Sequence, residues 1–73
     1  PAYVWANRGR AYRFLGRLDE ARTMFLDAQS CARRLGDDWL DCRCDIGLGV
    51  IAEQRGNFPE AESRYQRVLG RFN

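Results

Sequence analysis

The sequence predicts an all-α fold in which four antiparallel helices pair as two helical hairpins of a short α-solenoid. The first observation is an internal repeat, since the hexapeptide at residues 16–21 (Gly-Arg-Leu-Asp-Glu-Ala) returns forty residues later at 56–61 as Gly-Asn-Phe-Pro-Glu-Ala. The second is that apolar residues recur at every third or fourth position between these glycines. Self-similarity at such a period is typical of stacked helical hairpins. The same offset also pairs Gly9 with Gly49, Phe25 with Tyr65 and Ala28 with Val68.

The length allows one domain, residues 1–73, with a first repeat over 2–36 and a second over 37–73. A chain of this size buries only a small core, and about three stacked repeats are usually needed for a continuous one. The chain begins with Pro1 and stops at Phe72–Asn73, which the pattern places in the turn after a helix. We therefore expect it to be a piece of a longer array.

The first hairpin is predicted from the apolar spacing on either side of Gly16. Its helices are expected over Ala2–Leu15 and Asp19–Leu35. Gly16 and Gly36 are expected to end them in a left-handed conformation. The apolar stripe of the second helix comprises Ala21, Met24, Phe25, Ala28, Cys31, Ala32 and Leu35.

The second hairpin is predicted to begin with a helix over Asp38–Arg55 that is capped by Asp37 or Asp38. This helix is more apolar than the first, so we expect it to be buried on two sides. The last helix is expected from Pro59 to about Gly70, with Asn57 as its cap.

The glycines inside the helices are expected to mark close packing. A glycine there costs up to about 1 kcal/mol relative to Ala, so Gly9 and Gly49 are favourable only where two helices approach closely. Large aromatic residues are expected to fill the remaining space in the core. These are Trp5, Tyr12, Phe25, Tyr65 and Trp39.

The net charge of +2, from twelve arginines against ten acidic residues, is too small to favour nucleic-acid binding. No apolar run approaches the roughly 20 residues of a membrane span, and nothing resembles a signal peptide. We therefore expect no nucleic acid and no membrane as partners, and a cytoplasmic location. Because the chain has no His, no Gly-rich phosphate loop and no nucleophile beside a base, we also expect no enzyme.

The three cysteines are expected to be reduced thiols that pack as small residues. Cys42 and Cys44 are two apart on a predicted helix, roughly 200° around it, and cannot bridge each other. Without His or a cysteine pair at metal spacing, no zinc site and no other cofactor is expected. The alternative is a redox contact of Cys31 with Cys42 or Cys44 across the hairpin.

The first repeat resembles the tetratricopeptide repeat (TPR) pattern W-x-x-L-G-x-x-Y followed by A-x-x-x-F, with Arg8 in place of the Leu. The second repeat keeps the Leu-Gly pair but has Asp45 for the Trp and Ala52 for the Tyr. The offset exceeds the usual 34 residues, and the extra residues lengthen the second and third helices around Gly36. This is similar to the long-repeat type of kinesin light chains, polarity adaptors and bacterial signal-responsive regulators. The matching residues are Trp5, Gly9, Tyr12, Ala21, Phe25, Leu48, Gly49, Ala61 and Tyr65.

The resemblance implies a right-handed solenoid in which the first helix of each hairpin lines a concave peptide-binding groove. Asn7 could hold a peptide main chain, because an amide both donates and accepts, whereas Gly47 interrupts this ladder in the second repeat. Arg10 and Arg13 could grip a carboxylate in bidentate geometry. Each of these three side chains is alternatively a solvated polar group. The candidate peptide-contacting residues are Tyr3, Asn7, Arg10, Arg13, Arg43 and Val50, with Ala6, Arg17, Ile46, Gly47 and Glu53 on the same faces.

These features predict a non-catalytic protein-protein interaction module, peptide-binding or scaffold, with acidic peptides as the candidate class of partner. One alternative is an assembly element that forms a homo-oligomer through exposed terminal helices, because two repeats leave apolar ends uncovered. Another is a sensor segment of a bacterial transcription regulator, which rests on fold-level resemblance.

Overall fold

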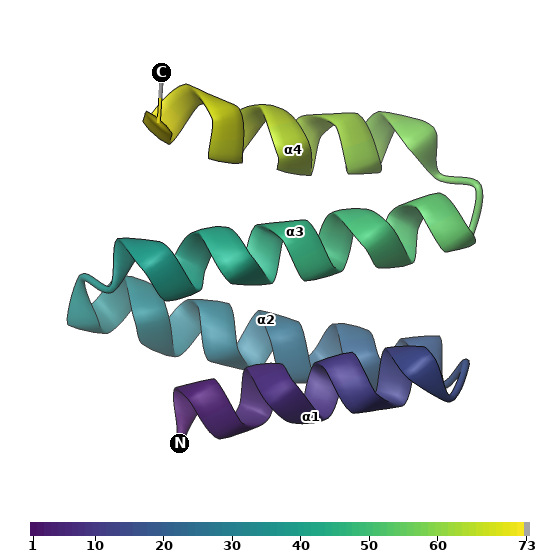
Figure 1. The fold of residues 1–73 in the computed structure, drawn as a ribbon, viewed down its shortest axis with the longest axis horizontal. Coiled ribbons are helices and arrows are strands. Elements are labelled where there is room, and N and C mark those ends of the chain that lie inside the picture. Colours follow the sequence, from purple (N-terminus) through teal and green to yellow (C-terminus); the bar gives the residue numbers. More distant parts are fainter. Residues whose placement is uncertain (73) are drawn as a thin grey trace.

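The computed structural model describes residues 1–72 and confirms the predicted all-α fold of two helical hairpins. Consecutive helices run antiparallel and lie side by side in chain order (Figure 1). The last helix continues to Phe72 rather than ending near Gly70, so Phe72 is not in a turn, and Asn73 lies outside the described residues. The helices are α1 (Ala2–Phe14), α2 (Leu18–Leu35), α3 (Asp38–Gln54) and α4 (Phe58–Phe72).

The three connections are built alike, each around a glycine with positive φ. Gly16, Gly36 and Gly56 have φ of 76°, 70° and 76°. In each turn the residue after the glycine donates its N–H to the carbonyl oxygen five positions earlier, at 2.8 to 2.9 Å. This pairing satisfies carbonyls that the helix end leaves open, and only glycine adopts the left-handed conformation without a steric cost. The predicted helix stops are therefore confirmed.

Side-chain caps begin the two helices of the second hairpin. Asp37 Oδ1 accepts from Leu40 N at 3.0 Å, which decides between the two predicted caps of α3. Asn57 Oδ1 accepts from Glu60 N at 3.4 Å, and its amide donates to Glu60 Oε1 at 3.2 Å. The Asn57 side chain therefore caps α4 through the backbone of Glu60 and is held in place by the Glu60 carboxylate.

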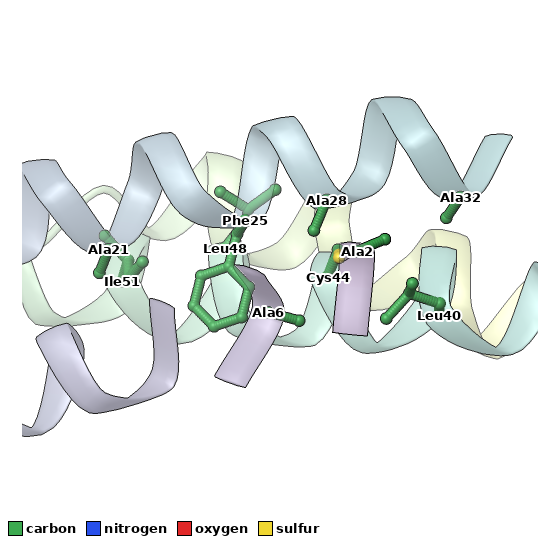
Figure 2. Packing of buried hydrophobic residues seen from close by; sticks show 10 residues of the cluster. All are labelled: Ala2, Ala6, Ala21, Phe25, Ala28, Ala32, Leu40, Cys44, Leu48 and Ile51. Carbon is green, nitrogen blue, oxygen red and sulfur yellow. The ribbon is translucent and has the colours of Figure 1, made fainter. Parts of the chain in front are cut away.

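The core lies where α3 packs against α2, with α1 completing it from the side (Figure 2). Small residues on α2 let the backbones approach, and α3 contributes larger side chains to the same layer. As expected from its composition, α3 is buried on two sides, by α2 and α4. The buried cluster comprises Ala2, Ala6, Ala21, Phe25, Ala28, Ala32, Leu40, Cys44, Leu48 and Ile51.

The aromatic residues are less buried than the sequence predicts. Phe25 is 5% exposed, as expected, whereas Trp5, Tyr12 and Tyr65 are only half-buried. The prediction that Trp39 is a core residue is wrong, because its side chain is 63% exposed. Leu40, the next residue, takes the inward direction in the first turn of α3, and adjacent residues on a helix point about 100° apart.

The three thiols are free, and Cys42 and Cys44 are buried while Cys31 is half-exposed. Burial raises the pKa of Cys44 to about 11 and shifts that of Cys42 upward. Because the thiolate is the reactive form, we expect a brief exposure to iodoacetamide at pH 8 to modify Cys31 first. Peptide mass mapping measures this, with urea-unfolded protein as the control in which all three react. Faster modification of Cys44 than of Cys31 would contradict the packing described here.

Candidate functional site

A cavity of about 270 Å³ opens between α1 and α3, the first helices of the two hairpins. Its rim carries three guanidinium groups, from Arg10 and Arg13 on α1 and Arg43 on α3. We call this cavity with its rim the groove. The remaining lining residues are Ala6, Phe25, Ile46, Gly47 and Val50, which make an apolar floor.

Helical spacing brings the lining residues of each helix onto one face. On α1, Ala6, Arg10 and Arg13 follow one another at intervals of four and three. On α3, Arg43 and Val50 are seven residues apart, which is about two turns. The spacing within each helix therefore puts these residues on one face, and the two faces form the rim and the floor where α1 and α3 lie side by side.

The floor of the groove depends on Phe25, which extends from α2 towards α1 (Figure 2). The ring passes between two glycines that have no room for a side chain. A Cβ added at Gly9 would lie 3.1 Å from the ring, and one added at Gly47 would lie 2.6 Å from it. Gly47 therefore has a packing role that the sequence did not reveal.

None of the three rim arginines forms an ion pair with the described residues, 1–72. Ion pairs among residues 1–72 engage seven other arginines but not Arg10, Arg13 or Arg43. Glu53, an acid on the same helix as Arg43, instead accepts a hydrogen bond from the Tyr65 hydroxyl. Burial, together with this bond, raises the pKa of Tyr65 to about 12. The groove is thus a cationic rim around an apolar floor.

The structure brings together four of the six predicted site residues, Arg10, Arg13, Arg43 and Val50. Tyr3 and Asn7 are exposed on α1 but do not line the cavity. The Tyr3 hydroxyl donates to Asp37 Oδ2 at 2.9 Å, and this bond raises its pKa. Phe25 was predicted as core only, and its place between Gly9 and Gly47 becomes visible only in the packing of the three helices.

A second cavity of about 320 Å³ lies on α1 and the start of α2. Its two acids are already engaged, since Asp19 pairs with Arg55 and Glu20 with Arg17. The hydrogen bond from Arg55 lowers the pKa of Asp19. The cavity is lined by Arg8, Tyr12, Asp19, Glu20, Thr23 and Met24.

A buried polar cluster joins α2, α3 and α4. Gln29 Nε2 donates to the Oδ1 atoms of Asp41 and Asp45, both at 2.9 Å. Arg64 donates to Asp45 Oδ1 at 3.0 Å, and Arg71 to Asp41 Oδ2 at 2.8 Å. No buried side-chain nitrogen or oxygen in residues 1–72 lacks a hydrogen-bond partner. The cluster therefore acts as a satisfied structural junction between the repeats.

Comparison with protein families decides the classification, because a family model described as tetratricopeptide repeat matches residues 2–73. The chain belongs to the TPR family. Comparison with curated proteins and with solved structures found no significant match. Membership of the TPR family indicates a module for protein-protein interaction. The predicted boundary between the repeats falls at Gly36–Asp37, in the connection between α2 and α3.

Two further properties of this TPR chain concern residues 1–72. No group of three or more His, Cys, Asp or Glu side chains is placed to hold a metal ion. None of the four helices is long and apolar enough to cross a membrane.

Proposed function

We propose that this TPR chain is a non-catalytic module that holds a peptide segment of a partner protein in the groove. The observation that carries the proposal is the set of three guanidinium groups that form no ion pair with residues 1–72, around an apolar cavity. A segment with an apolar side chain flanked by Asp or Glu would place the apolar group on Phe25 and Val50 and its carboxylates on the rim.

The chemistry of the groove favours this class of peptide. Guanidinium groups bind carboxylates in bidentate geometry, and Arg13 and Arg43 are half-buried, so water screens them less than fully exposed groups. The cavity of about 270 Å³ is large enough for one leucine or phenylalanine side chain. Tyr3 and Asn7 would extend the contact along α1, with the Asn7 amide facing the peptide main chain.

Reversing the rim charge tests the proposal. We expect Arg10→Glu with Arg13→Glu to weaken binding at least tenfold, because attractive carboxylate contacts become repulsive. The probe is a fluorescein-labelled peptide pool in which Leu or Phe is flanked by Asp or Glu, and fluorescence anisotropy measures its affinity. The matched control, Arg8→Glu with Arg34→Glu, changes the net charge equally outside the groove.

Circular dichroism must show that both double variants keep the helicity of the parent. Equal losses of affinity in the two variants would mean that binding follows net charge, and unchanged affinity in the first would remove the groove as the site. Weaker binding at higher salt is expected for the parent, since screening acts on the exposed Arg10 most strongly.

The finer classification is also a proposal. We infer the long-repeat TPR type from the forty-residue offset and from α2 and α3, the longest helices at 18 and 17 residues. The three free thiols support a reducing compartment such as the cytoplasm.

A further inference from the structure

An acidic residue, Glu53, lies beside the groove and next to the arginines of its rim. It follows Val50, a lining residue, by three positions on α3, and residues at this spacing have Cβ atoms about 5 to 6 Å apart. The forty-residue offset relates Glu53 to Arg13, and α1 and α3 run in the same direction (Figure 1). The carboxylate and the guanidinium group therefore belong to corresponding turns of the two helices that line the groove.

Glu53 nevertheless forms no ion pair with a rim arginine, and Tyr65 on α4 engages it instead. The Tyr65 hydroxyl donates a hydrogen bond to Glu53 Oε1. The positive charge of Arg13 partly offsets the rise in the pKa of Tyr65, so Arg13 is within electrostatic range of the hydroxyl. The carboxylate is thus held on the α4 side of α3, although a cation of the rim is near.

The ring of Tyr65 is fixed against α3 at Gly49. A Cβ added at Gly49 would lie 2.5 Å from Cε1 of the ring, so the absence of a side chain lets the half-buried ring pack directly on the helix. Glu53 is four residues after Gly49 and lies on the same face of α3. Because packing fixes the ring, its hydroxyl is preorganised to bind the carboxylate.

Without this hydrogen bond, the exposed Glu53 side chain would be attracted to the rim, since Arg13 offers it an opposite charge and the hydroxyl no longer competes. The pair would neutralise one of the three charges that a ligand carboxylate meets. We propose that Tyr65 is a positioning residue that holds Glu53 away from the rim and so keeps Arg13 free for the ligand. This role rests on the proposed binding of peptides in the groove.

Tyr65→Phe removes only the hydroxyl and tests the proposal. We expect the affinity for the labelled peptide pool to fall about two- to fivefold, because the ligand must displace an exposed ion pair from the rim. Adding Glu53→Gln to Tyr65→Phe is expected to restore the affinity of the parent, since the amide carries no charge. An affinity loss that this second change does not restore would overturn the proposal. Tyr12→Phe is the matched control, because Tyr12 lies outside the groove.

A measurement without peptide separates this role from the proposed function. In Tyr65→Phe the Nε–Hε NMR signal of Arg13 is expected to shift, because the Glu53 carboxylate becomes its acceptor. The signal should return to the position of the parent when Glu53→Gln is added. An Arg13 signal that is the same in the parent and in Tyr65→Phe would overturn the proposal even if peptides bind. A reversible shift in a chain that binds no peptide would support the positioning of Glu53 and remove the peptide as the ligand of the groove.

Discussion

Replacing Asp45 with Ala is expected to lower the free energy of unfolding by about 3 to 5 kcal/mol. The carboxylate is 2% exposed and accepts from Gln29 at 2.9 Å and from Arg64 at 3.0 Å. The Arg64 side chain is only 17% exposed, so without Asp45 its charge stays in the interior with one fewer acceptor. Removing one partner of a buried pair lowers the free energy of unfolding more than replacing both partners with apolar residues does.

Urea unfolding followed by circular dichroism measures the loss. Asp27→Ala is the matched control, because Asp27 is exposed on α2 and its removal should change stability by about 0.5 kcal/mol or less. Asp45→Asn keeps an acceptor oxygen and should fall between the two, which leaves a measurable value if the Ala variant does not fold. An Ala variant within about 1 kcal/mol of the parent would contradict this account of the cluster.

Replacing the buried polar triad of Gln29, Asp45 and Arg64 with apolar residues distinguishes the loss of one partner from the loss of the whole hydrogen-bonded group. Gln29→Leu, Asp45→Leu and Arg64→Met together leave no buried group unpaired, so stability should recover most of what Asp45→Ala loses. Asp41 keeps its bonds from Arg71 at 2.8 Å and from Arg33 at 3.3 Å. Recovery of the free energy of unfolding would show that the triad adds little to stability. Its main role would then be to specify how the two repeats pack together.

The parts of the fold that could be predicted are those fixed by local chemistry. Gly16, Gly36 and Gly56 adopt the left-handed conformation that ends the first three helices, and glycine at these positions is enough to predict it from the sequence. The exposure of Trp39 is different, because it depends on which side of α3 its neighbours cover. The polar cluster was also missed, since Asp45 meets Arg64, nineteen residues away, only after α4 has packed against α3.

The candidate site likewise has one part that spacing within a helix predicts and another that depends on contacts between helices. Spacing within a helix was enough to place Arg10 and Arg13 on one face of α1. It could not show that Tyr3 bonds to Asp37, thirty-four residues away in the connection between α2 and α3. Nor could it show that Phe25, from a helix outside the groove-lining pair, forms part of the floor.

Gly47→Ala is the second prediction with a large effect, a loss of about 1 to 3 kcal/mol in the free energy of unfolding. The added Cβ would lie 2.6 Å from Cζ of Phe25, and that ring is 5% exposed and has little space to move. Alanine stabilises a helix by up to about 1 kcal/mol relative to glycine. The measured loss is therefore the free-energy cost of the clash minus this gain in helix propensity.

Gly70→Ala is the matched control, because Gly70 is also helical but an added Cβ there meets no heavy atom within 4 Å. It should be neutral or stabilising, by up to about 1 kcal/mol. If the clash is with the ring, adding Phe25→Leu to Gly47→Ala should cost less than the sum of the two single changes, and thermal unfolding of the four proteins measures this coupling. A Gly47→Ala variant as stable as Gly70→Ala would mean that the ring gives way easily. The groove would then have a floor that moves, and peptide binding could no longer rely on a preformed cavity between α1 and α3.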